Sequence, residues 1–370
     1  MKVPYVDLGA QWLEEEDECL KEISRILRGG KSIGDPVIEE LESEISELLG
    51  VKHCVSLNSG TDALIMGLNS LGVKRQDEVI TVANSFIAST AAIAHIGAVP
   101  KFVDVGNDHL INPNLIESAI TQKTKAIMPV HLEGKMCDMP AIKNIADKYG
   151  LYVIEDAAQS FGSSFSKIQP GQMSDLACFS FHPLKNLNGI GDGGFIATNR
   201  EEVAKRISQI RNHGLVDRDT SLEFGFVSRL DSIQAAILRI RLRALSNVIS
   251  VRSKIANQYD LGLDSKYITT PVFADEVRHT YHLYVIEIDS RNFVQSELES
   301  LGVQTKIHYP KLICDQPAYK VKFGELNQEL PNTRRQTDRI LSLPIHQNLS
   351  KDQIHYVIDS LNSIVRVVAK

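Results

Sequence analysis

Between residues 52 and 199, short apolar segments alternate with segments of helical periodicity. The apolar segments have the length and residue content of buried strands: 53–57, 78–82, 99–104, 126–130, 152–155, 176–181 and 195–198. Helical patterns such as 61–71 and 141–149 separate many of them. Parallel strands need crossover connections of this kind, so the alternation predicts an α/β domain whose mostly parallel sheet is covered on both faces.

The flanking segments extend this domain and predict a second one. Residues 39–49 have the pattern of a charged amphipathic helix outside the sheet. Residues 231–256 predict a long helix, whose arginine-rich face we expect to be solvated or at an interface. Two further strands and two further helices are expected after it, at 282–288 and 303–308 and at 294–301 and 351–365. We therefore predict a large domain at residues 1–245 and a smaller C-terminal α+β domain at 246–370.

Composition excludes several classes of partner. The 370 residues carry 40 Lys+Arg against 46 Asp+Glu, a net charge of -6, which gives no basic field for a nucleic acid. The five cysteines form no CxxC pair, so we expect neither a disulfide framework nor a metal site. The N-terminus has no apolar leader, and no apolar run approaches the ~20 residues of a membrane span. A cytoplasmic location without membrane partners is the expectation.

Two charged residues follow strand ends, where ligands of parallel sheets bind. Asp156 directly follows 152–155, and Lys185 lies just past 176–181. An aspartate alone at such a place is equally typical of a helix cap or a metal ligand. Together the two residues match the needs of pyridoxal phosphate (PLP): a lysine that holds the aldehyde as a Schiff base and moves a proton, and a carboxylate that keeps the pyridine nitrogen protonated. We expect confinement to lower the pKa of Lys185.

A small-residue turn at 58–63 could hold the phosphate of this cofactor. The turn follows a strand and precedes a helix that starts at Thr61, so the N–H groups around Gly60 and Thr61 face outward. A plain helix cap would explain the same residues. Ser180 could add a hydroxyl to the phosphate site. Phe86, at another strand end, could stack on a flat heterocycle, although alone it is more typical of a core.

The glycine-rich run 189–194 superficially resembles a dinucleotide-binding motif. That motif must follow a strand and open a helix, whereas this run precedes the strand at 195–198. We interpret it as a tight loop that sets the position of Lys185.

Seven segments, in order along nearly the whole chain, resemble the DegT/DnrJ/EryC1/StrS group of sugar aminotransferases: 3–8, 59–64, 84–88, 155–160, 180–194, 228–236 and 307–310. The resemblance implies an aspartate-aminotransferase-like fold (PLP fold type I) with a seven-stranded, mostly parallel sheet. It also implies a homodimer with shared active sites.

The resemblance assigns a role to each candidate residue. The imine lysine would be Lys185, with Asp156 as the partner of the pyridine nitrogen. The remaining cofactor contacts would come from Gln159 on the ring hydroxyl, Gly60, Thr61 and Ser180 on the phosphate, and Phe86 stacked on the ring. A departure occurs at Val227, where the family usually has an asparagine that reaches the phosphate across the subunit interface. Valine cannot donate, so Ser228, a backbone N–H or water replaces the contact, or phosphate binding is weaker.

The implied activity is transfer of an amino group from L-glutamate to a nucleotide-linked keto-sugar. Such enzymes supply amino sugars for lipopolysaccharide O-antigen, other glycans or antibiotics. The segment 211–214 resembles members that act on 3-keto sugars, so a dTDP-3-keto-6-deoxyhexose is favoured, with a 4-keto or UDP-linked sugar left open. His308 is a candidate sugar or diphosphate contact.

Other readings stay open from sequence alone. Relatives with histidine in place of Lys185 dehydrate the sugar ring, and lysine favours the transaminase. A nicotinamide-dependent sugar oxidoreductase would need NAD(P) and show no visible imine absorbance. A PLP-binding regulatory protein would show that absorbance without a half-reaction with glutamate.

Overall fold

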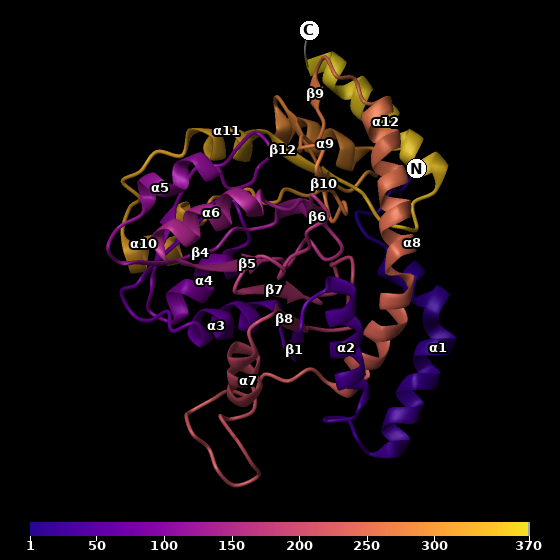
Figure 1. The fold of residues 1–370 in the computed structure, drawn as a ribbon. Helices are drawn as coiled ribbons and strands as arrows, with labels where there is room; N and C mark the ends of the chain where they lie inside the picture. The colour runs from indigo at the N-terminus through magenta and orange to yellow at the C-terminus, as the bar shows by residue number, and fades with distance from the viewer. Residues whose placement is uncertain (369–370) are drawn as a thin grey trace.

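A seven-stranded sheet lies at the centre of the computed structural model, which describes residues 1–368 (Figure 1). Its strand order is β1-β8-β7-β5-β4-β2-β3, and β8 runs antiparallel to both neighbours while the remaining pairings are parallel. The strands are β1 (His53–Leu57), β2 (Glu78–Thr81), β3 (Val99–Phe102), β4 (Thr124–Ile127), β5 (Tyr152–Asp156), β7 (Leu176–Ser180) and β8 (Gly194–Thr198). The prediction of a mostly parallel α/β sheet is confirmed, and each strand expected between residues 52 and 199 overlaps one of these.

Helices cover both faces of this sheet because the strands are apolar on both sides. One face packs against α3 (Gly60–Ser70), α4 (Ile87–His95) and α7 (Glu201–Ile210). The other face packs against α2 (Val37–Leu49), α6 (Met139–Tyr149) and the first half of α8 (Ser232–Gly262), while α1 (Leu8–Gly29) lies outside α8. The short η1 (Pro113–Leu115) and α5 (Ile116–Ala119) precede β4.

The arginines of α8 make contacts within the chain. Arg239 binds Glu44 of α2 at 2.6 Å, and Arg241 Nε donates to Glu15 of α1 at 2.9 Å. Arg241 is buried, and its Nη1 also donates to the carbonyls of Asn188 and Gly189. The prediction of a solvated or interfacial arginine face is therefore wrong for Arg241, because Glu15 of α1 and the carbonyls of Asn188 and Gly189 surround it.

The second half of α8 packs on a three-stranded sheet of order β12-β11-β9, made of β9 (Ile268–Thr269), β11 (Tyr284–Ile288) and β12 (Ile340–Leu343). The helices α9 (Arg291–Ser300) and α12 (Lys351–Val368) complete this C-terminal core. The predicted boundary at 245/246 falls inside α8, and the division into two domains stays a prediction. The strand expected at 303–308 is wrong: the segment forms only single bridges, from Val303 to Val3 and from Lys306 to Ser342. Different chain segments take these two bridges, so no continuous ladder forms.

In the sequence between β11 and β12, the chain returns to the large sheet. The elements η3 (Ile313–Asp315), α10 (Pro317–Phe323) and α11 (Pro331–Arg339) lie there, and apolar side chains of η3 and α10 pack with Ala83 and Phe102. Three short elements complete the fold: η2 (Leu132–Gly134), β6 (Ser164–Phe165) and β10 (Val277–Arg278). Within residues 1–368, no helix has both the length and the apolarity to cross a bilayer.

The start of β8 passes directly under the start of α3. A Cβ atom on Gly194 would lie 2.5 Å from the carbonyl carbon of Ser59 and 2.6 Å from the nitrogen of Gly60. We predict that Gly194→Ala lowers the free energy of unfolding by about 3 kcal/mol or more, because backbone must move to make room. Gly29→Ala is the control: its Cβ meets nothing within 4 Å, so it should be neutral or stabilise α1 by less than about 1 kcal/mol. Equal effects in urea unfolding would contradict the packing argument.

Candidate active site

A cavity of about 370 Å³ opens at the carboxyl ends of β5 and β7. The ends of the large sheet and the first turns of α3 and α4 line it, and the N-terminal segment, α8 and the C-terminal region contribute further residues. Every residue predicted for the site lines this cavity: Gly60, Thr61, Phe86, Asp156, Gln159, Ser180, Lys185 and His308. Segments that are far apart in the sequence thus meet at one place.

Asp156 is a buried carboxylate at the end of β5. Its Oδ2 accepts a hydrogen bond from Ser89 Oγ at 2.6 Å, and its Oδ1 accepts from the N–H of Ala158 at 3.2 Å. Burial raises the pKa of Asp156, while these hydrogen bonds and the charge of Lys185 oppose the shift. The carboxylate is therefore held in place, and an adjacent cation would stabilise its ionised form.

Lys185 follows β7 in a turn closed by its own N–H, which donates to the carbonyl of His182 at 2.8 Å. Burial lowers the pKa of Lys185 to about 8, and the charge of Asp156 opposes this shift. Roughly a tenth of the amine is consequently neutral at pH 7, far more than for an ordinary lysine, and the neutral form is what a nucleophile or general base requires.

The first turn of α3 forms the anion-binding end of the cavity. Ser59 caps the helix through Oγ, which accepts from the N–H of Asp62, and the N–H groups of Gly60 and Thr61 belong to the turn that a helix leaves without internal partners. A Cβ on Gly60 would lie 2.8 Å from Cβ of Ser180. The absence of a side chain at Gly60 therefore lets the helix start beside the end of β7, which brings the Ser180 hydroxyl to the same place.

Gln159 and Phe86 approach the cavity together with Tyr309. Gln159 Oε1 accepts from the N–H of Glu133 at 2.7 Å, and its Nε2 donates to the Tyr309 hydroxyl at 3.1 Å. The Phe86 ring is 54% exposed and lies 5.7 Å from the Tyr309 ring, centroid to centroid. Phe86 is thus a cavity-wall aromatic, and the alternative that it belongs to the core is wrong.

His308 faces the cavity as a neutral imidazole. Burial lowers its pKa to about 4, and the charge of Lys185 acts in the same direction. Its Nδ1 lies 2.9 Å from Ser342 Oγ on β12. The side chain can therefore exchange hydrogen bonds with a ligand but offers no positive charge to it.

Sequence reasoning missed several groups in this site. Ser89 and Arg252 lie within helices and carry no motif, so only the folded chain shows that they reach the cavity. Tyr309 directly follows His308 inside a segment already singled out, so that segment could have indicated it. Arg211 binds the Ser56 carbonyl at 2.7 Å and does not line this cavity. Val227 is exposed and forms a single antiparallel bridge with Asn212, just after α7.

Comparisons with known proteins agree with this geometry. Residues 13–362 match the DegT/DnrJ/EryC1/StrS aminotransferase family. The chain is 39% identical to UDP-2-acetamido-2-deoxy-3-oxo-D-glucuronate aminotransferase of Pseudomonas aeruginosa, over 98% of this chain and 100% of that protein. It is 38% identical to dTDP-3-amino-3,4,6-trideoxy-alpha-D-glucose transaminase of Streptomyces venezuelae, over 97% and 95% of the two chains. The crystal structure of S. venezuelae DesV in complex with a ketimine intermediate superposes with a TM-score of 0.95, at 37% identity, over 98% of both chains.

The lowered pKa of Lys185 makes its amine unusually reactive. In cofactor-free protein, we predict that trinitrophenylation of Lys185, followed by peptide mass spectrometry against pH, has its midpoint near pH 8. Asp156→Asn should move the midpoint lower, since Asp156 raises the pKa of this lysine. A midpoint near ~10.4, the ordinary value for a lysine, would show that burial does not act on the amine.

Proposed function

The chain belongs to the DegT/DnrJ/EryC1/StrS aminotransferase family, and we propose that it transfers an amino group from L-glutamate to a nucleotide-linked keto-sugar. The observation that carries the proposal is the meeting of Lys185, Asp156 and the first turn of α3 around one cavity. An amine of lowered pKa, a buried carboxylate and an anion site are the three groups that a PLP transaminase needs.

Enzymes of this family use PLP, and the cavity residues fit that cofactor. The phosphate would be held by Gly60, Thr61 and Ser180. A side chain at residue 60 would occupy part of this place, because its Cβ would contact Ser180. Asp156 would face the ring nitrogen, Gln159 the ring oxygen and Phe86 the ring plane. When bound, the cofactor supplies an aldehyde for the amine of Lys185 and withdraws electrons from the reacting carbon.

The chain's own groups account for the remaining steps. Asp156 would keep a proton on the ring nitrogen, because a buried carboxylate is stabilised by an adjacent cation. In the first half-reaction Lys185 would move a proton from the amino-bearing carbon of glutamate to the cofactor, which keeps the amino group. In the second it would move a proton from the cofactor to the sugar carbon, which gives ping-pong kinetics.

The substrate proposal goes one step further, to a ketone at C3. Both relatives described above are named for 3-oxo or 3-amino sugars, one linked to UDP and one to dTDP. A dTDP-linked 3-keto-6-deoxyhexose is the first choice and a UDP-linked sugar the second. The neutral His308 suits a sugar hydroxyl better than a diphosphate, because it offers hydrogen bonds without charge.

A homodimer with shared sites is also part of the proposal. The segment from Gly214 to Val227 carries the fully exposed Phe224 and the exposed Leu222, and it extends away from the body of the chain (Figure 1). Such side chains are typical of a surface that a second copy covers. The cytoplasm is the proposed location, and the five cysteines of the chain are all buried and free.

Lys185→Ala tests the proposed function most simply. Wild-type protein saturated with PLP should develop visible absorbance that glutamate abolishes and a keto-sugar nucleotide restores. Lys185→Ala should keep the fold but show neither the wild-type absorbance nor turnover. Titration with dTDP- and UDP-linked 3-keto and 4-keto sugars then identifies the acceptor. A colourless wild-type protein that instead oxidises a sugar with NAD(P) would contradict the proposal.

Val227→Asn tests the shared site. If residue 227 of one subunit lies at the phosphate of the other, an asparagine should tighten PLP binding by about 2- to 10-fold, the contribution of one hydrogen bond. Val216→Asn, on the same exposed segment, is the matched control and should leave the Kd unchanged. Sedimentation should first show that each protein is a dimer. Equal PLP affinities of both variants and the wild type would then argue against this contact.

A further inference from the structure

The Gln159 amide has only one orientation that satisfies its neighbours. The N–H of Glu133 can only donate, so the Gln159 oxygen must face it, at 2.7 Å. The NH₂ group then faces the cavity and donates to the Tyr309 hydroxyl. Gln159 consequently offers hydrogens, and no lone pair, to a ligand at this place.

The N–H of Glu133 points to Gln159 because of an uncommon backbone conformation. Glu133 has φ 67° inside η2, a left-handed region that is unfavourable for a residue with a side chain. Its carboxylate is fully buried and binds Lys135 Nζ at 2.7 Å and His109 Nδ1 at 2.7 Å. These two ion pairs oppose the backbone cost and fix the direction of the N–H.

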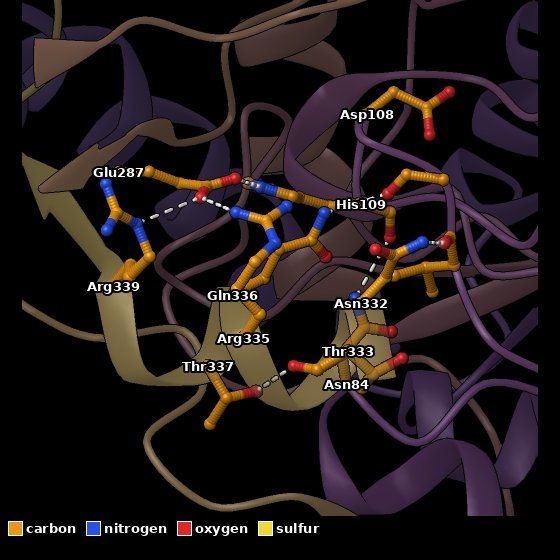
Figure 2. A network of polar contacts seen from close by, with 12 residues as sticks. Asn84, Asp108, His109, Glu287, Asn332, Thr333, Arg335, Gln336, Thr337 and Arg339 are labelled. Atoms are coloured by element: carbon orange, nitrogen blue, oxygen red, sulfur yellow. Dashed lines mark hydrogen bonds and ion pairs between the residues drawn. The ribbon is translucent and has the colours of Figure 1, made fainter. Parts of the chain in front are cut away.

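The network continues to the C-terminal sheet (Figure 2). His109 Nε2 lies 3.2 Å from Glu287 Oε1 on β11, and Glu287 Oε2 accepts from Arg335 at 2.6 Å and lies 3.5 Å from Arg339 on α11. His109 is therefore held between two carboxylates that come from different parts of the fold.

Charge on these groups follows from their partners. Burial by itself lowers the pKa of His109, but Glu133 and Glu287 outweigh it and raise the pKa, which favours the cationic imidazole. Burial likewise raises the pKa of Glu133, but the charges of Lys135 and His109 outweigh it and hold the pKa well below the ordinary value. The carboxylate thus stays ionised and keeps its two anchors.

We propose that Glu133 is a positioning residue that fixes Gln159 as a hydrogen-bond donor to the ring oxygen of the cofactor and so favours the ionised form of that oxygen. The inference rests on the proposed function, since it needs PLP in the cavity. A donor stabilises an anionic oxygen and lowers its pKa. Without the Glu133 N–H as its partner, the Gln159 amide can rotate. Its hydrogen bond to the ring oxygen then weakens, and the pKa of that oxygen rises.

The readout is the pH midpoint at which the visible spectrum of the PLP-bound protein changes, recorded without substrate. Gln159→Leu, which removes the donor, should raise the midpoint by about 1 to 2 pH units, which corresponds to the roughly 1.5–3 kcal/mol of a hydrogen bond to a charged group. Glu133→Gln should raise it in the same direction by about half as much. His109→Gln, which removes one anchor, should give a smaller rise and replaces Glu133→Gln if that variant does not fold.

Asp104→Asn is the matched control. Asp104 is a buried carboxylate that accepts from the N–H and the hydroxyl of Thr333 on α11, so it ties similar segments together without contacting Glu133 or Gln159. It should lower the melting temperature but leave the midpoint unchanged. If Glu133→Gln lowers the melting temperature like Asp104→Asn and leaves the midpoint at the wild-type value, the positioning role is refuted. If wild-type protein gains no visible band with PLP, the proposed function fails and this inference with it.

Discussion

The site depends on the burial of one carboxylate, Asp156. A buried ionised acid is costly unless charge and hydrogen bonds compensate it. Ser89 and the N–H of Ala158 supply part of the compensation, and Lys185 supplies a distant charge. A pyridinium nitrogen would supply the rest. Burial raises the pKa of Asp156 and lowers the pKa of Lys185, so the same cavity shifts the pKa of both groups.

Much of the fold could be predicted from sequence. The strands are short apolar runs separated by helical patterns. This alternation can be recognised locally in the sequence, because burial of both sheet faces requires apolar strands. The segment 303–308 was misjudged because its pattern is that of a strand, while its bridging partners, Val3 and Ser342, come from opposite ends of the chain. The pairing of Arg241 with α1 was equally out of reach, since nothing local specifies which helix covers it.

The candidate site could likewise be predicted only in part from the sequence. Asp156, Lys185 and the turn at Gly60 could be found because strand ends and glycine-containing turns leave a trace in the sequence. Ser89 could not, because a serine inside a helix has no distinguishing pattern. The buried network around Glu133 and His109 was missed for a related reason: His109, Glu133 and Glu287 come from three separate segments, and each alone resembles a surface residue.

The central claim is a covalent bond between the amine of Lys185 and the aldehyde of PLP. Reduction of the PLP-saturated protein with borohydride, followed by proteolysis and mass spectrometry, tests it directly. The account predicts one phosphopyridoxyl group per chain, on the peptide that contains Lys185. Label on a different lysine, or label scattered over several surface lysines, would contradict it.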